Sequence, residues 1–169
     1  MKKLVYFLEN RHNNVIRGRK WEKVGIMFFG SFTHTLDEKG RLVIPAKMRE
    51  EAGLKLFIMK GFDGALAIYK KDEFEKLVAQ VESLPFNKKV SRDYQRIQLA
   101  SVTELDVDKA GRVQLPQTLL TKYEIGKDVI VLGVGDHMEV WDAVKYEKYI
   151  SQVDDDFEKI AENIDPTNI

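Results

Sequence analysis

The feature that most constrains the fold is an internal repeat. The stretch 36–45 reads LDEKGRLVIP and returns as VDKAGRVQLP at 107–116, with its Asp, Gly, Arg and Pro each displaced by 71 residues. The apolar segment 57–61 returns at 129–133 with an offset of 72. Repetition at a fixed spacing is the signature of one structural unit used twice. The chain is therefore predicted to contain two tandem copies of a small module.

The repeat divides the 169 residues into five parts. They are predicted to be an N-terminal extension at 1–26, a first repeat at 31–78, a connecting helix at 79–101, a second repeat at 102–149 and an acidic tail at 150–169.

Each module begins with a segment that has the chemistry of a β-hairpin. Residues 32–36 alternate in the manner of a strand, 37–40 have turn composition with Gly40 where a left-handed residue is needed, and 41–44 resume a strand. Pro45 interrupts the ladder and suits the first turn of a helix, which the good helix formers that follow extend to Gly53. The sequence predicts a hairpin followed by a helix of about two turns.

The rest of the module is predicted to be two strands and an amphipathic helix. Strands at 56–59 and 66–69 precede a helix with apolar residues at i, i+3, i+4 and i+7, for which Asp72 is the predicted N-cap. The second copy follows the same order, and Asp142 opens its last helix. Between the copies, 87–99 has apolar residues at helical intervals and is predicted to be the connecting helix.

Composition bounds the class of protein. Apolar residues make up 44% of the chain and charged residues 32%, which is typical of a globular protein, and there is no Cys to form disulfides or thiolate metal sites. No apolar run approaches the roughly 20 residues of a membrane span, so neither an anchor nor a signal peptide is predicted. A cytoplasmic protein is the expectation.

Net charge is formally zero and does not by itself predict a nucleic-acid partner. Residues 1–26 carry seven Lys or Arg against two acidic residues, whereas residues 152–169 carry six acidic residues against one Lys. Any basic surface on the core must therefore come from local clustering, and the first copy offers one such cluster: Lys39, Arg41, Lys47 and Arg49.

The repeated turn carries the candidate chemistry. An Asp that opens a tight turn can accept hydrogen bonds from backbone amides two residues on, while Gly supplies a positive φ at low steric cost. A turn does not require the Arg that follows four residues after each Asp. That Arg can pair with the Asp carboxylate and hold the tip, or it can bind a phosphate or a guanine edge. Duplication alone does not choose between these roles, because a structural device would be duplicated as well.

The stretch 27–49, MFFGSFTHTLDEKGRLVIPAKMR, resembles the opening of the bacterial MraZ proteins, whose two Asp-x-x-x-Arg motifs stand here at Asp37/Arg41 and Asp108/Arg112. The resemblance covers about residues 27–150. It implies an α+β fold in which two AbrB-like β-hairpin/helix units pack into one pseudo-twofold, β-barrel-like domain with flanking helices. It also implies ring-shaped homo-oligomers, and sequence-specific control of the division and cell-wall gene cluster through direct repeats in double-stranded promoter DNA upstream of the protein's own gene.

Carried over residue by residue, the resemblance assigns two sets of positions. The DNA-facing set is Lys39, Arg41, Lys109 and Arg112, and the loop-shaping set is Asp37, Gly40, Asp108 and Gly111. The second turn has Lys109 one position earlier than Lys39 has in the first, so the two loops are not equivalent. DNA as partner also implies a nucleoid-associated protein.

Residues 1–26 precede the part that resembles the family, and their codons suggest why. Trp21-Glu22 must be encoded TGG-GA, Val24-Gly25 can place a second TGGG ten nucleotides later, and Arg17-Gly18 can place a TGG ten nucleotides earlier. Ten base pairs is about one turn of B-DNA, and the operators of the family resemble such G-rich direct repeats. The hypothesis is that residues 1–26 are upstream DNA read as protein and that translation starts at Met27; the alternative is a basic N-terminal arm.

Other classes of function find little support. The three histidines lack the spacing and the acidic or Cys neighbours of a metal site, so no metal and no cofactor is predicted: His12, His34 and His137. Met48 and Met59 are expected in the core. No motif of an enzyme is present. The remaining alternative to a regulator is a non-enzymatic interaction or assembly protein related to AbrB-type antitoxins.

Overall fold

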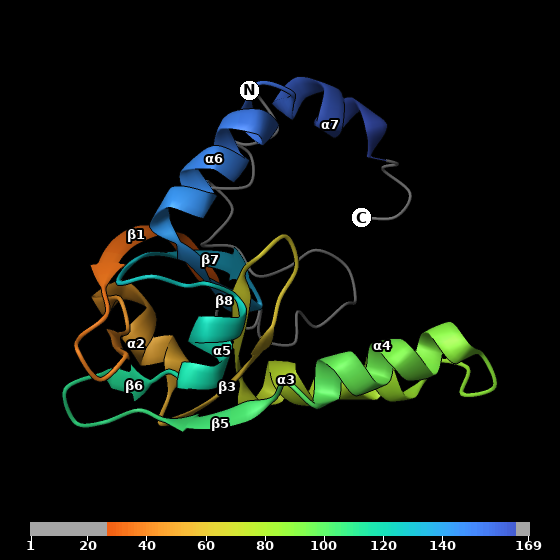
Figure 1. Cartoon of the computed structure of the whole chain (residues 1–169), viewed down its shortest axis with the longest axis horizontal. Coiled ribbons are helices and arrows are strands. Elements are labelled where there is room, and N and C mark those ends of the chain that lie inside the picture. Colours follow the sequence, from red (N-terminus) through yellow and green to blue (C-terminus); the bar gives the residue numbers. More distant parts are fainter. Residues whose placement is uncertain (1–26, 165–169) are drawn as a thin grey trace, which may run out of the picture.

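The computed structural model describes residues 27–164. Its elements fall into two sets with the same order of strand, strand, helix, strand, strand, helix (Figure 1). The first set is β1(Phe28–Thr35), β2(Arg41–Val43), α2(Ala46–Ala52), β3(Lys55–Lys60), β4(Leu66–Lys70) and α3(Lys71–Glu82). The second set is β5(Thr103–Asp106), β6(Arg112–Gln114), α5(Gln117–Lys122), β7(Asp128–Gly135), β8(His137–Asp142) and α6(Ala143–Asp154). Helix α4(Lys89–Leu99) connects the sets, and α7(Phe157–Asn163) follows the second.

The strands form two antiparallel sheets. The larger has six strands in the order β1-β7-β8-β4-β3-β5, and the smaller pairs β2 with β6. Exchanging each strand for its counterpart in the other copy reverses the six-strand order and leaves it otherwise unchanged. The α+β class predicted from sequence is therefore confirmed, and the strand order has the symmetry expected of two related units.

The strand register shows where the pseudo-twofold axis passes. In the large sheet, Leu66 lies opposite Val140 and Ile68 opposite Met138, and the offset of 72 converts one pair into the other. In the small sheet, Leu42 lies opposite Val113, its own counterpart at an offset of 71. The axis therefore crosses both sheets, and the two copies share a single interior.

Two predictions about this architecture are wrong. The segments on either side of the first turn do not pair as a hairpin, because β1 pairs with β7 and β2 pairs with β6. The large sheet is also not closed into a barrel, and β1 and β5 form its two edges. The turn residues specify a local reversal but not the partner of the strand that follows. That strand pairs with its counterpart because Leu42 and Val113 then bury each other, both 1% exposed.

The main core lies between the two sheets and the short helices α2 and α5. It contains Met48 from α2 and Leu119 and Leu120 from α5, together with inward-facing residues of all eight strands. Met59 is also buried, as was expected for both methionines. A second cluster around Trp141 lies beneath α6, which Figure 1 shows extending away from the sheets.

The longer helices agree with the sequence in position but not in every cap. Helix α6 begins at the predicted cap, where the Asp142 carboxylate accepts a hydrogen bond from the amide of Lys145 at 3.1 Å. Helix α3 instead begins at Lys71, so Asp72 lies in its first turn and the predicted cap is wrong. Helix α4 forms where predicted and leaves Val90 and Ile97 exposed. None of the helices within 27–164 has the length and apolar character to span a membrane.

Candidate nucleic-acid interface

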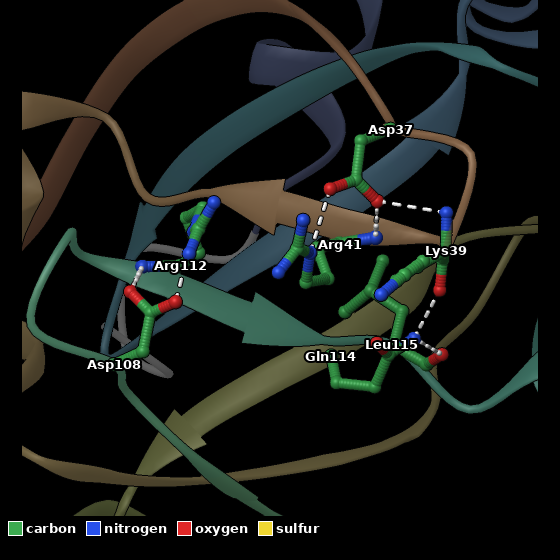
Figure 2. A network of polar contacts seen from close by, with 7 residues as sticks. All are labelled: Asp37, Lys39, Arg41, Asp108, Arg112, Gln114 and Leu115. Atoms are coloured by element: carbon green, nitrogen blue, oxygen red, sulfur yellow. Dashed lines mark hydrogen bonds and ion pairs between the residues drawn. The ribbon is translucent and has the colours of Figure 1, made fainter.

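The first Asp-to-Arg turn lies between β1 and β2 and is organised by a single carboxylate. Oδ1 of Asp37 accepts hydrogen bonds from the backbone amides of Lys39 and Arg41, both at 2.9 Å, and Oδ2 accepts one from Nε of Arg41 at 2.6 Å (Figure 2). Gly40 sits between them with a φ of +71°, a conformation that L side chains rarely adopt. One carboxylate thus binds both the backbone of the tip and the side chain of the Arg that follows it.

The second turn, between β5 and β6, repeats this arrangement atom by atom. Oδ1 of Asp108 accepts from the amides of Ala110 at 2.8 Å and Arg112 at 3.0 Å, and Oδ2 accepts from Nε of Arg112 at 2.8 Å. Gly111 has a φ of +74°. The two roles that the sequence left open for Arg are therefore not exclusive, because the pair with Asp uses only Nε.

Electrostatics favours the charged form of both carboxyls. The pKa of Asp37 is lowered from its ordinary value of 3.8, mainly by the hydrogen bond from the backbone amide of Arg41 and then by the Arg41 side chain. The pKa of Asp108 is lowered in the same way, mainly by the amide of Arg112. Both Asp side chains remain charged at neutral pH, so both turns keep their ion pairs.

Each turn is also held by the opposite copy. The carbonyl of Gly40 accepts a hydrogen bond from the amide of Leu115 at 3.1 Å, and the carbonyl of Gly111 accepts one from the amide of Ile44 at 2.9 Å. The Gln114 side chain adds a contact of its own to the carbonyl of Lys39 (Figure 2). Each tip is therefore supported across the pseudo-twofold axis by hydrogen bonds from the opposite copy.

The two arginines lie on one outer face. In the small sheet Arg41 is opposite Gln114 and Arg112 is opposite Val43, so these four residues share the face that Leu42 and Val113 do not. Figure 2 shows the two Asp–Arg pairs at opposite ends of the β2–β6 pair. The side chains of Arg41 and Arg112 are 32% and 36% exposed. Within residues 27–164 no hydrogen bond occupies the terminal Nη groups of either one.

The lysines of the candidate set lie at the tips of the turns. Lys39 and Lys109 are both exposed, and they occupy different positions of their turns, as the sequence showed. The structure thus places all four predicted DNA-facing residues at the surface around β2 and β6. This surface, defined by Lys39, Arg41, Lys109 and Arg112, is called the β2–β6 face below.

Comparison with known proteins identifies the family. The family model described as "MraZ protein, putative antitoxin-like" matches the chain twice, over residues 27–97 and 99–166. The chain belongs to the MraZ family.

Individual MraZ relatives agree with this assignment. A protein named transcriptional regulator MraZ from Thermoanaerobacter sp. (strain X514) is 41% identical over 143 residues, which are 85% of this chain and 100% of the relative. The protein of the same name from Caldanaerobacter subterraneus subsp. tengcongensis is 42% identical over the same shares. That from Limosilactobacillus reuteri is 38% identical over 82% of this chain and 97% of its own. The resemblance drawn from sequence is confirmed, and MraZ proteins are regulators and not enzymes.

Two residues that contact the turns were not predicted as part of the site. Gln114 binds the first turn, as described above. Arg49, at the end of α2, lies against the second turn: a Cβ added to Gly111 would be 2.7 Å from its Nε. The sequence showed Arg49 only as part of a basic cluster with the first turn, because contacts between copies are not encoded in spacing along the chain.

The other candidates have no comparable geometry. His34 lies on β1 and His137 on β8, while His12 falls outside the described residues. Residues 27–164 contain no group of three or more His, Cys, Asp or Glu side chains arranged to hold a metal ion.

Proposed function

We propose that this MraZ family member is a sequence-specific DNA-binding transcriptional regulator. In this proposal it binds short direct repeats in double-stranded promoter DNA upstream of its own gene and controls the division and cell-wall gene cluster, which places it in the cytoplasm at the nucleoid. The proposed DNA contacts are Lys39, Arg41, Lys109 and Arg112, with Asp37, Gly40, Asp108 and Gly111 shaping the two loops.

The observation that carries the proposal is the shared outward face of Arg41 and Arg112. Each guanidinium is oriented by its Nε bond to an Asp, while its Nη groups stay available to an acceptor. Arg presents two parallel donors that match a phosphate or the O6/N7 edge of guanine. A guanidinium that is already oriented loses less side-chain entropy when it binds.

The spacing of the two arginines suits one short segment of duplex. They are diagonal neighbours in an antiparallel pair, which places their backbones about 7–8 Å apart. Two successive phosphate steps along one strand of the DNA duplex span about 7 Å of its helix axis. Both turns of one chain can therefore reach the same short G-rich site, which is the kind of sequence expected from the codons of residues 17–25.

Assembly into a ring is the second part of the proposal. One chain presents few cations on the β2–β6 face, so its binding to DNA would be weak and sensitive to salt. Several copies joined in a homo-oligomeric ring would engage successive repeats, and each contact after the first becomes intramolecular. Repeats ten base pairs apart lie on one side of the duplex, where neighbouring subunits can reach them.

The third part of the proposal concerns the DNA that encodes residues 1–26. We propose that they correspond to the operator itself, translated from an upstream start, with native translation beginning at Met27. The support is that the family match begins at residue 27 and that the possible codons place TGGG-like elements ten nucleotides apart. A native N-terminus at Met1, or a gene whose codons lack this spacing, would instead favour a basic arm.

The deciding experiment is a gel-shift titration. The probe is a duplex with TGGG repeats at ten-base-pair intervals, and the competitor is a scrambled duplex at the same salt concentration. We expect binding to the repeats that is lost in Arg41→Ala while the oligomer, measured by light scattering, is unchanged. Arg96→Ala on α4, which removes the same charge far from β2 and β6 (Figure 1), is the matched control and should bind as wild type.

Two results would overturn the proposal. Equal affinity for repeated and scrambled DNA would remove sequence-specific recognition, and full binding by Arg41→Ala would remove Arg41 from the interface. An oligomer that binds neither duplex would leave the alternative predicted from sequence, an interaction or assembly protein related to AbrB-type antitoxins.

A further inference from the structure

The two turns have the same internal hydrogen bonds but different neighbours. The repeat offset of 71 makes Arg49 of α2 the counterpart of Leu120 of α5. A Cβ added to Gly40 would lie 3.2 Å from Cδ1 of Leu120, whereas one added to Gly111 would lie 2.7 Å from Nε of Arg49. The first turn is therefore backed by a buried leucine, and the second turn is flanked by an exposed guanidinium.

Arg49 is held in place by the backbone. Its Nε donates a hydrogen bond to the carbonyl of Ile44 at 2.8 Å, and the amide of Ile44 donates to the carbonyl of Gly111 at 2.9 Å. The same peptide segment thus fixes both Arg49 and the second turn. As in Arg41 and Arg112, the bond uses Nε, and no hydrogen bond from the Nη groups is present among the described residues.

The positive charge of Arg49 affects the pKa of a neighbouring histidine. The pKa of His34, on the adjacent strand β1, is lowered from 6.5, first by burial and second by the positive charge of Arg49. Two carboxylates follow Arg49 in sequence, Glu50 and Glu51, but no ion pair joins Arg49 to either within residues 27–164. Among the described residues, its guanidinium is therefore a cation beside the second turn that forms no ion pair.

The tips differ in charge as a consequence. In the first turn, residues 37–41 contain two acidic and two basic side chains, which cancel. In the second turn, residues 108–112 contain one acidic and two basic side chains, for a sum of +1, and Arg49 raises the local sum to +2. A phosphate approaching the β2–β6 face is attracted more strongly by the second turn.

We propose that Arg49 is a further DNA-contacting residue that binds a backbone phosphate beside the second turn, making this turn the stronger electrostatic anchor of the two. The proposal rests on the DNA-binding function proposed above. Arg49 belongs to α2 and lies beside the second turn, whereas Arg41 and Arg112 belong to the strands β2 and β6. A flanking cation positions the protein on the duplex, and cations on the face are the ones placed to read base edges.

The test is the salt dependence of binding. Arg49→Gln keeps a polar side chain but removes the charge. The affinity of this variant for repeated and scrambled duplexes is measured from about 0.05 to 0.3 M salt, because counterion release is resolved in this range. One lost phosphate contact lowers the slope of log K against log salt by about 0.9 and weakens binding about eightfold at 0.1 M salt. The loss should be the same factor on both duplexes.

Matched variants separate this effect from damage to the fold. Arg96→Gln removes the same charge from α4 and should leave the slope unchanged. Arg49→Lys keeps the charge and should keep the wild-type slope. Nuclear magnetic resonance titration of His34 checks the site directly, because its pKa should rise in Arg49→Gln when the neighbouring charge is gone.

The outcomes distinguish this inference from the proposed function. One outcome is that wild type prefers the repeats, Arg41→Ala no longer binds them, and Arg49→Gln keeps the wild-type affinity and slope. In that case the role of Arg49 is overturned and the proposed function stands. If Arg49→Gln weakens binding to the repeats alone with an unchanged slope, the phosphate contact is overturned in favour of a base contact. If Arg49→Lys also loses the slope, the effect is structural and the inference fails. If wild type does not prefer the repeats, both fail.

Discussion

The two Asp-to-Arg turns have equivalent internal hydrogen bonds but different neighbouring residues. In each turn one Asp carboxylate accepts hydrogen bonds from the equivalent backbone amides and from Nε of the equivalent Arg. Yet Leu120 and Gln114 lie against the first turn, whereas Arg49 lies against the second. The difference arises because each turn packs against the opposite copy. Local residues fix the shape of a turn, and the residues that flank it come from elsewhere in the chain and can differ.

The largest expected effect comes from the core contact that supports both turns. Leu42 and Val113 face each other at the pseudo-twofold axis and are each 1% exposed. Leu42→Ala should lower the free energy of unfolding by about 2–5 kcal/mol, because it leaves a cavity in the core. Chemical denaturation measures the loss. Since β2 and β6 depend on this contact together, hydrogen exchange of the Gly40 and Gly111 amides should accelerate in both turns.

A matched control uses a leucine that is exposed. Leu54 is 79% exposed, so Leu54→Ala should change stability by about 0.5 kcal/mol or less. If Leu42→Ala accelerated exchange in the first turn and left the second as in wild type, the two turns would be independent, and support across the axis would be excluded.

The second effect concerns the carboxylates and should be equal in the two turns. Both Asp37 and Asp108 have a folded pKa below 3.8, so each contributes stability that is fully present above about that pH and is lost as the pH falls through the folded pKa. Asp37→Asn and Asp108→Asn should therefore destabilise the protein at pH 7. The difference from wild type should shrink as the pH falls below 3.8.

Thermal unfolding between pH 2 and 7 measures this dependence. Glu38→Gln is the control, because it removes the same charge from the first turn, and Glu38 makes no side-chain hydrogen bond among the described residues. A destabilisation of Asp37→Asn that stayed constant down to pH 2, or one that matched Glu38→Gln, would show that the carboxylate does not act through its hydrogen bonds to the turn.

Much of the fold could be predicted because its determinants are local. The repeat predicted the order of elements, Pro45 and Gly53 bounded α2, and Asp142 capped α6 as expected. Asp72 failed as a cap because α3 begins one residue earlier, directly after β4. Local patterns therefore located the elements well and their ends less well.

Strand pairing could not be predicted from the same patterns. Residues 37–40 have the composition of a hairpin turn, and the turn does form, with the amide of Gly40 bonded to the carbonyl of Asp37 at 2.8 Å. The strand after it pairs with β6, whose residues come 71 positions later. The candidate site divides in the same way: the motif predicted Asp37 and Arg41, whereas Gln114 and Arg49 depend on contacts between copies.

The smallest expected effect tests the support that belongs to the first turn alone. The Gln114 amide donates to the carbonyl of Lys39, and the counterpart of Gln114 in the first copy is Val43. Gln114→Val gives both turns the same residue at this position. The substitution also removes the longer hydrogen bond from the Gln114 amide to the carbonyl of Leu115. The loss should cost about 0.5–1.5 kcal/mol, and hydrogen exchange should accelerate at the amides of residues 39–41 while those of 110–112 serve as the internal control. Equal acceleration in both turns would mean that Gln114 stabilises the small sheet as a whole, and the asymmetry between the turns would then rest on Arg49 and Leu120 alone.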